Sequence, residues 1–503
     1  MACEIADHLA RIRSCANEDD ARDDCCHCSF RCLGCHPGPL RHACPCAAYS
    51  FARRSAAVWF AILNLDKLSP RQRCQRVPPF DGNPCMSVNT KEFEIVVFGA
   101  TSFVGKILCN YLCNEYREPN LRWAMAARSS AKLAELKAEL GENAKAVPLI
   151  VADSADAESL AQLCDRTELV ISTVGPYALY GELLIEACVR GGVDYCDLTG
   201  EPQWIRRMVD RYEALAQQSG ARIVHSCGFD SIPSDLGVKH LQEAAQTQFG
   251  SYCDKVKMRV VKMKGGASGG TVASGLNVYR EAAKDPVLQA ELRDSYSLCP
   301  QGHDFTLRQP SVGVEYDEDM KSWAGPFIMA SINTRIVLRS NALWPNHYSN
   351  NFLYDEALLL GDGEKGHKAA TKLAFGMKWG MMAMAIAPIR AFAQRFFLPK
   401  PGEGPTPEQQ LNGMFDLHFI GTTEAGDKLV TRVTGDRDPG YGSTAKMLAQ
   451  AGISLRRDVD QQSVGGGFWT TATAFNERFY ERLQAHAGLT FDVLEATPSS
   501  SAE

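Results

Sequence analysis

The sequence predicts an α/β protein in which a doubly wound parallel sheet is followed by a second α+β domain with a mixed sheet. Short apolar runs alternate with amphipathic segments from Glu94 onward, and a glycine-rich turn follows the first run. Beyond about residue 250 the pattern changes to longer, alternating segments. Strands that alternate with helices imply right-handed crossovers and a parallel sheet covered on both faces.

Composition sets wide limits on what the protein does. A chain of 503 residues is long enough for two or more domains. Its 45% hydrophobic and 22% charged residues are ordinary for a soluble protein, and a net charge of -6 gives no reason to expect a nucleic-acid partner. Of 19 cysteines, 11 precede Met86, and the other 8 are typical of reduced, buried side chains. We therefore expect a cytoplasmic protein.

Residues 1–85 differ from the rest of the chain. Their cysteines and histidines could supply a tetrahedral zinc site, but the spacings match no regular zinc finger. We expect this Cys-rich leader to be poorly structured or a mis-assigned start, with Met86 as the true first residue. A metal-binding module is the alternative. In the rest of the chain the histidines show no paired ligand spacing, so we expect no metal there.

The first domain is expected over residues 86–240. "FEIVVFGA", "LRWAMAAR", "AVPLIVAD" and "ELVISTVGP" are the first four predicted strands, and "VDYCDLTG" and "ARIVHSCGF" follow them. Segments with apolar residues at helical spacing separate these strands, beginning with "GKILCNYLCNEY" and ending with "IRRMVDRYEALAQQSG". This alternation predicts a Rossmann-like domain.

The second domain is expected over residues 241–430. "KVKMRVVKMKG" alternates as a strand does, "GGASGGTVASGLNVYREAAKD" predicts a glycine turn into a helix, and "GPFIMASINTRIVLRSNAL" predicts a strand and then a helix. Residues 431–503 return to strand, glycine turn and helix, and we expect this C-terminal segment to pack near the cleft.

Residues 374–398 form the most apolar stretch. Lys378, Pro388, Arg390 and Arg395 interrupt it, whereas a transmembrane helix needs about 20 apolar residues with few charges. A helix at a membrane surface or partner surface remains open, because methionines and cations suit such a face. A buried helix or the lining of a substrate tunnel is the alternative.

The turn "GATSFVG" is the first candidate site. Gly99 ends the strand and Gly105 lies in the first helical turn, where a pyrophosphate would meet backbone N–H groups. Thr101, Ser102 and Phe103 complete the predicted cofactor-binding turn. Ser102 stands where a glycine is usual, so we expect its side chain at the closest phosphate approach.

Arg128 and Ser129 follow the second strand, where an NAD-selective site usually carries an acid. An arginine there accommodates the 2′-phosphate of NADP, so NADP(H) is preferred and NAD(H) remains possible. A solvated loop cation is the alternative for Arg128. Asp153 follows the third strand and could meet the adenine edge, although such a residue is more often a helix cap.

The fourth strand ends where the backbone would run beside the nicotinamide ribose. The candidate cofactor-binding residues there are Thr173, Val174, Gly175 and Pro176. Candidate substrate-binding residues nearby are Tyr177, Tyr195 and Asp230, since a tyrosine hydroxyl can donate to a developing oxyanion. Each tyrosine could equally be a packed aromatic, and Asp230 could be a turn or capping residue. No catalytic residue is assigned.

Several long motifs occur together in order, among them "VFGATSFVG", "TVGPYALYGELLIEACVRGGVDYCDLTGE", "CGFDSIPSDLG" and "GDRDPGYGSTAKMLAQAG". The chain from Met86 onward resembles the saccharopine dehydrogenase-like oxidoreductases, and specifically their trans-acting enoyl reductase branch. It departs from that pattern at Ser102, where glycine is usual, and at "GGGFWTTATAF", where a proline is usual.

The resemblance implies an NADPH-dependent oxidoreductase that reduces an enoyl or acyl lipid intermediate. In mycobacterial members it implies an intermediate held by a partner polyketide synthase, so we expect a small-molecule or carrier-bound acyl substrate. A peripheral membrane or synthase contact is open. The alternatives are a saccharopine-type amino-acid reductase, disfavoured because the cleft motifs are poor in Arg and Lys, and a non-catalytic nucleotide-binding scaffold at a lipid surface.

Overall fold

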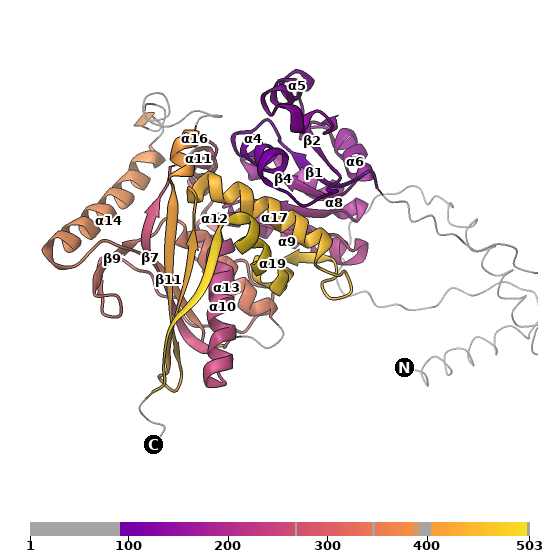
Figure 1. Cartoon of the computed structure of the whole chain (residues 1–503). Helices are drawn as coiled ribbons and strands as arrows, with labels where there is room; N and C mark the ends of the chain where they lie inside the picture. The colour runs from indigo at the N-terminus through magenta and orange to yellow at the C-terminus, as the bar shows by residue number, and fades with distance from the viewer. Residues whose placement is uncertain are drawn as a thin grey trace, which may run out of the picture. The chain divides into compact units, whose positions relative to one another are not determined.

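The chain divides into two units, Met1–Met86 and Ser87–Glu503. A computed structural model describes residues 91–266, 269–344, 348–386, 388–389, 392 and 404–499 (Figure 1). The expectations about residues 1–85, the zinc module and the start at Met86 among them, lie outside the described residues, as does most of the apolar stretch beyond residue 386.

The first sheet is parallel and has the strand order β13-β6-β5-β4-β1-β2-β3. Its strands are β1 (Phe93–Phe98), β2 (Trp123–Ala127), β3 (Leu149–Val151), β4 (Thr167–Ser172), β5 (Asp194–Asp197), β6 (Arg222–Val224) and β13 (Gly467–Trp469). The chain runs outward from β1 to β3 on one side and from β4 to β6 on the other. The order therefore reverses between β1 and β4, where open α/β sheets bind their ligands.

Helices connect these strands and cover the sheet. They are α4 (Phe103–Asn110), η2 (Tyr111–Glu115), α5 (Ser130–Glu139), η3 (Glu142–Ala144), α6 (Ala157–Arg166), α7 (Tyr177–Tyr180), α8 (Glu182–Gly191) and α9 (Pro202–Ser219). The central strands are apolar on both faces because both faces are covered: Ile95, Val96 and Val97 are each at most 1% exposed. The Rossmann-like prediction is confirmed.

The second sheet is mixed, as predicted, with the order β14-β12-β11-β7-β10-β9-β8. Its strands are β7 (Cys253–Lys264), β8 (Glu315–Asp317), β9 (Ser322–Pro326), β10 (Leu353–Leu359), β11 (Met414–Thr423), β12 (Lys428–Gly435) and β14 (Leu489–Thr497). Only β7 and β10 pair in parallel; the other pairs are antiparallel. The strand-then-helix pattern expected over residues 325–343 corresponds to β9 and α13 (Ala330–Leu343).

The remaining helices follow the first six strands of the first sheet in the chain. They are α10 (Ile232–Phe249), α11 (Gly269–Ala282), α12 (Pro286–Glu291), α14 (Gly363–Ala385), α16 (Pro407–Leu411), η4 (Pro439–Ser443), α17 (Thr444–Arg457), α18 (Thr471–Ala474), α19 (Glu477–Arg482) and η5 (Leu483–Ala487). Helix α10 packs against β11, β12 and β14, and α14 packs against β9.

The C-terminal segment contributes to both sheets. Strand β13 extends the first sheet beside β6, whereas β12 and β14 pair in the second sheet. Helix α17 packs against β4, β5 and α4. The domain boundaries at residues 240 and 430 stay predictions, and the structure adds that the chain returns to the first sheet after residue 440.

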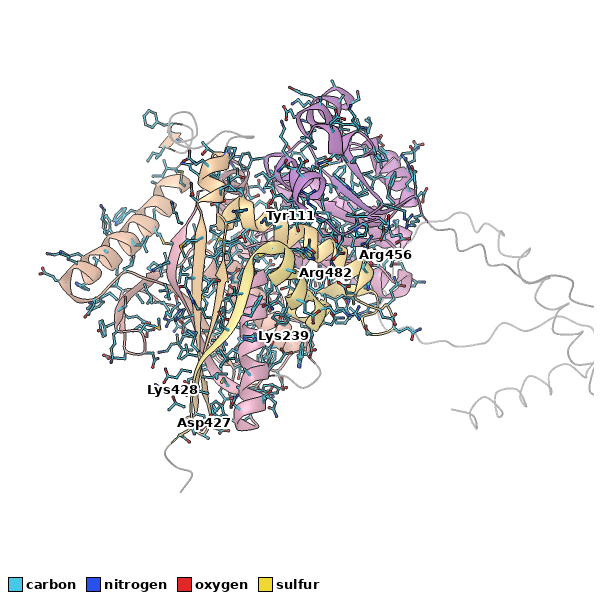
Figure 2. The ribbon with its side chains drawn as sticks, viewed as in Figure 1. Tyr111, Lys239, Asp427, Lys428, Arg456 and Arg482 are labelled. Atoms are coloured by element: carbon cyan, nitrogen blue, oxygen red, sulfur yellow. The ribbon has the colours of Figure 1, made fainter. Side chains whose placement is uncertain are left out.

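Polar contacts fix this return. The Tyr111 hydroxyl of η2 donates to the His486 carbonyl at 3.1 Å and accepts from Gln450 Nε2 at 2.7 Å. Figure 2 labels Tyr111 together with Arg456 of α17, which pairs with Glu168 of β4. The C-terminal helices are thus attached to the first domain at several independent points.

Candidate functional site

The turn after β1 has the geometry of a dinucleotide-binding turn. Gly99 has φ of +86°, and a Cβ atom there would lie 2.6 Å from Val174 Cγ2 and 2.8 Å from Thr173 Oγ1. A Cβ on Gly105 would overlap the Gly99 carbonyl oxygen. Both glycines are therefore required by the backbone: one for a left-handed turn against β4, the other for the approach of α4 to the turn.

The Ser102 side chain takes part in building the turn. It caps α4 by accepting the Gly105 N–H at 2.9 Å, and its hydroxyl lies 2.9 Å from Thr173 Oγ1. Thr173 Oγ1 also lies 2.9 Å from the Gly99 carbonyl oxygen. The Ser102 hydroxyl, which we expected at the closest phosphate approach, is thus hydrogen-bonded to the start of α4 and to Thr173 after β4. These two bonds make the turn more rigid than a glycine at position 102 would.

The start of α4 offers donors for an anion. Within the described residues, the N–H groups of Phe103 and Val104 have no hydrogen-bond acceptor. The Phe103 ring packs edge-on against Tyr441, with centroids 5.1 Å apart, and a Cβ on Gly404 would overlap it. Phe103 therefore joins the turn to the second part of the chain through its side chain and leaves its backbone N–H for a ligand.

Arg128 lies at the end of β2 and is exposed. No ion pair joins its guanidinium to another described residue. Ser129 caps α5, accepting the Lys132 N–H at 3.3 Å. A free arginine beside a helix N-terminus suits a phosphate, so the turn and this edge together fit an NADP-type dinucleotide.

Asp153 follows β3 and makes a local turn. Its Oδ1 accepts the Ala155 N–H at 3.0 Å, while Asp156 is the residue that caps α6. The capping role that we weighed for Asp153 therefore belongs to Asp156. Asp153 Oδ2 makes no hydrogen bond to another described residue and is the atom left for an adenine edge.

The segment after β4 meets the second domain. Gly175 is exposed, and a Cβ there would lie 3.7 Å from Ser274 Oγ of α11. Glu201 accepts the N–H groups of Tyr177 at 2.9 Å and Ala178 at 3.0 Å, and so fixes the start of α7. Sequence reasoning did not find Ser274, because only the tertiary fold brings α11 to this edge.

The two candidate tyrosines have their hydroxyls inside the protein. Tyr177 is 3% exposed and donates to the Ser172 carbonyl at 3.0 Å, and Tyr195 is fully buried and donates to Asp197 Oδ2 at 3.1 Å. Burial raises the pKa of both phenols well above the usual value. Their structure is that of packed aromatics with bonded hydroxyls, the alternative that the sequence left open.

Asp230 is different, because it reaches the same edge and stays part-exposed. It follows β6, and its Oδ2 lies 3.1 Å from the point where a Cβ of Gly200 would be. Removal from water raises its pKa to about 7. A carboxyl group in this state can hold or release a proton near neutral pH.

The turn around Asp438 both caps a helix and holds the second glycine-rich turn. Asp438 Oδ2 accepts the Tyr441 N–H at 2.9 Å, and Oδ1 accepts the Gly266 N–H at 2.9 Å. Gly266 in turn lies against Pro405. One carboxylate thus ties the segment before α11 to the segment before α17, beside the Phe103–Tyr441 contact.

Helix α14 presents an apolar stripe away from its sheet. Its buried side, which includes Ala370 and Leu373, packs on β9 near Gly325. Phe375, Trp379, Met382 and Ile386 are 52–62% exposed and follow one another at helical spacing. Throughout the described residues, no helix combines the length and apolar character needed to cross a bilayer.

Known proteins resemble the chain over most of its length. Residues 95–224 match the family model of the saccharopine dehydrogenase NADP-binding domain. A Mycobacterium tuberculosis protein named provisionally as a trans-acting enoyl reductase is 36% identical over 414 residues, covering 80% of this chain and 97% of the relative. The trans-acting enoyl reductase of Mycobacterium ulcerans is 35% identical over 414 residues, covering 79% and 97%.

Among solved structures, saccharopine dehydrogenase (L-Glu forming) from Saccharomyces cerevisiae aligns with a TM-score of 0.43 at 12% identity. The alignment covers 80% of this chain and 99% of the yeast chain. The mycobacterial relatives are aligned along almost their whole length, so the likeness extends through both sheets.

Proposed function

Because this chain belongs to the trans-acting enoyl reductase family of saccharopine dehydrogenase-like oxidoreductases, we propose that it uses NADPH to reduce the carbon–carbon double bond of an enoyl thioester. The observation that carries the proposal is the turn of residues 99–105, with its two free N–H groups, lying next to the exposed and unpaired Arg128. That combination fits a pyrophosphate and a 2′-phosphate held at one sheet edge.

Each group at the edge would have a separate part in holding the dinucleotide. Gly99, Thr101, Phe103 and Gly105 would supply the pyrophosphate turn, with Ser102 as its internal brace. Arg128 and Ser129 would bind the 2′-phosphate, and Asp153 would face the adenine. The backbone of residues 173–176 would flank the nicotinamide ribose. When bound, the reduced nicotinamide supplies the hydride.

The chain's own contribution is placement. Glu201 fixes the start of α7, and Ser274 of α11 approaches the same point from the second domain. A substrate bound between these elements would be held in one orientation and shielded from water on two sides. Of the candidate substrate-binding residues, Asp230 has a carboxyl group without a hydrogen bond to a described residue, so it could contact a substrate. Tyr177 and Tyr195 would instead support the site through packing, because their hydroxyls are already hydrogen-bonded.

The substrate is proposed to be an apolar acyl chain carried by a separate synthase. "Trans-acting" is part of the relatives' names and describes an activity supplied from another polypeptide. A saccharopine-type reaction would need cations to hold several carboxylates, and none of the described residues that contact Gly175 or Asp230 is a cation. An apolar acyl substrate therefore fits the site around Gly175 and Asp230 better than a substrate with several carboxylates does.

Helix α14 is proposed to contact an anionic lipid surface. Its exposed stripe of Phe375, Trp379, Met382 and Ile386 continues the line of Lys368 and Lys372, and Glu364 is the helix's single acid. The protein as a whole carries a charge of -6, so this cationic, aromatic helix differs from its surroundings. Cations beside an exposed aromatic stripe favour anionic headgroups.

The test begins with cofactor binding by the full chain. Titration with NADPH and with NADH, followed by nicotinamide fluorescence, should give tight binding of NADPH and weak binding of NADH. The NADPH complex is then mixed with a trans-2-enoyl thioester of coenzyme A, and loss of reduced-nicotinamide absorbance is followed. Binding without turnover of either short or long acyl chains would contradict the enoyl reductase proposal and leave the cofactor site standing.

A further inference from the structure

The loop between β6 and α10 holds two non-glycine residues in left-handed backbone conformations. Ser226 has φ of +59° and Ser231 has φ of +107°. Each such residue costs about 1–3 kcal/mol and persists only where the surroundings fix it, typically at functional sites. The strained backbone therefore marks this loop as a candidate functional element.

Contacts from two other parts of the chain fix the first half of the loop. Ser226 Oγ donates to the Thr199 carbonyl at 2.7 Å, and the Cys227 N–H donates to the Asp197 carbonyl at 2.7 Å. The Phe229 N–H donates to Thr444 Oγ1 of α17 at 2.9 Å. These bonds come from β5 and the residues after it and from α17, so segments far apart in the sequence position the loop.

Ser231 is anchored in the second domain. Its hydroxyl lies 3.0 Å from Asn333 Oδ1 of α13, and Asn333 Nδ2 donates to Glu356 Oε2 of β10 at 3.0 Å. The residues on both sides of Asp230 are therefore immobilised, while the Asp230 carboxylate itself makes no hydrogen bond to a described side chain or backbone group.

Asp230 lies on the nicotinamide half of the sheet edge. Residues 128 and 153 follow the strands on the adenine side of the reversal, whereas β4, β5 and β6 lie on the other side. Gly200, after β5, leaves the room that the carboxylate occupies, since a Cβ there would be 3.1 Å from Asp230 Oδ2. The loop thus presents one carboxyl group, part-exposed, where the substrate is proposed to bind.

We propose that Asp230 is the proton donor of the reduction, acting on the α-carbon of the enoyl thioester. This role rests on the proposed function. As the β-carbon gains the hydride, the carbon–carbon π bond breaks and its electrons move toward the thioester carbonyl. The Asp230 O–H bond then breaks, a C–H bond forms at the α-carbon, and the carboxylate regains its proton from water.

The electrostatic surroundings suit that role. Burial alone raises the pKa of Asp230 to about 7, so much of the group is protonated at neutral pH. Tyr177 is one titratable neighbour that the charge of Asp230 affects, and the pKa of that phenol lies well above the usual range, so Tyr177 stays neutral. No charged partner among the described residues competes for the proton, and the acid is returned to its donating form by solvent.

The experiment compares wild type, Asp230→Asn and a matched control, Asp165→Asn on the exposed face of α6. Asp230→Asn should keep the Kd for NADPH within about threefold and lower kcat on trans-2-dodecenoyl-CoA by about 10²–10⁴-fold, the usual contribution of general acid–base catalysis. Wild-type kcat should fall as pH rises through about 7, and this limb should be absent from the variant's residual rate. Asp165→Asn should match wild type throughout.

A second readout does not depend on turnover. Carbon-13 NMR of aspartate-labelled protein should show one carboxyl titrating near pH 7 that is missing from Asp230→Asn. Because the folded pKa is raised, ionisation destabilises the folded protein, so the variant should melt above wild type at about pH 8 and together with it near pH 4. A carboxylate whose charge the fold stabilises would instead lower the melting temperature at about pH 8 when replaced.

The outcomes separate the two proposals. If wild type reduces the thioester while Asp230→Asn retains kcat within about threefold, or if no carboxyl titrates near neutrality, the proton-donor role is overturned and the enoyl reductase function stands. If wild type binds NADPH but reduces no enoyl thioester, the proposed function fails, and the proton-donor role fails with it.

Discussion

Replacing Arg128 by alanine should change cofactor selectivity without changing the fold. The side chain is exposed and pairs with no other described residue, so its loss removes no internal contact. A surface change of this kind alters stability by no more than about 0.5 kcal/mol. Any large effect must therefore come from a ligand.

The magnitude follows from the bond that is lost. A hydrogen bond between an arginine and a charged phosphate contributes about 1.5–3 kcal/mol. Since about 1.4 kcal/mol corresponds to a tenfold change in affinity, the Kd for NADPH should rise by roughly 10- to 150-fold. NADH has no 2′-phosphate, so its Kd should stay within about twofold. Added salt should weaken NADPH binding by wild type more than by the variant.

Fluorescence titration of both cofactors against wild type, Arg128→Ala and Arg190→Ala measures this directly. Arg190 is an exposed arginine at the C-terminal end of α8, at the opposite edge of the sheet, and serves as the matched control. Equal losses of NADPH and NADH affinity in Arg128→Ala, or an unchanged Kd for NADPH, would refute the assignment of the 2′-phosphate to Arg128.

Three further changes test other parts of the structure. Gly105→Ala places a methyl group against the Gly99 carbonyl oxygen, so NADPH affinity should fall at least about tenfold and the free energy of unfolding by about 1–3 kcal/mol. The control Gly380→Ala, with open space around the added methyl group, should lower neither the affinity nor the stability. Asp194→Ala leaves the Arg222 cation buried and unpaired, and urea unfolding should show a loss of about 3–5 kcal/mol. Replacing Phe375 and Trp379 by serine should abolish co-flotation with phosphatidylserine vesicles at unchanged NADPH affinity; unchanged flotation would exclude α14 as the lipid contact.

The sequence specified the local parts of the fold well. The apolar runs marked the strands of the first sheet, because a strand covered on both faces must be apolar throughout. Gly99 and Gly105 marked the turn, because only glycine fits a left-handed conformation or so close a helix. Arg128 was predicted as a cofactor-binding residue because it follows the second strand, where an acid is usual in NAD-selective sites. That prediction needs only the order of the strands in the sequence.

Other parts depended on residues far apart in the chain. The sequence could say that Ser102 replaces a glycine, but the bond to Thr173 that turns its hydroxyl inward joins residues 71 positions apart. The sequence names Tyr177 and Tyr195 as candidates, but only the folded structure shows that both hydroxyls are buried and hydrogen-bonded. The hydrogen bond by which Asp438 holds the second glycine-rich turn at Gly266 joins residues 172 positions apart.

What the sequence determined by itself is the class of fold, the family and the position of the glycine turn after β1, because these depend on periodicity and on glycine at fixed spacing. What the tertiary structure decided is which polar groups remain available. Hydrogen bonds take up the hydroxyls of Ser102, Tyr177 and Tyr195, whereas no described residue binds the Arg128 guanidinium or the Asp230 carboxyl group. Availability depends on what surrounds a side chain in space, and that is set only when both sheets and the C-terminal segment have packed together.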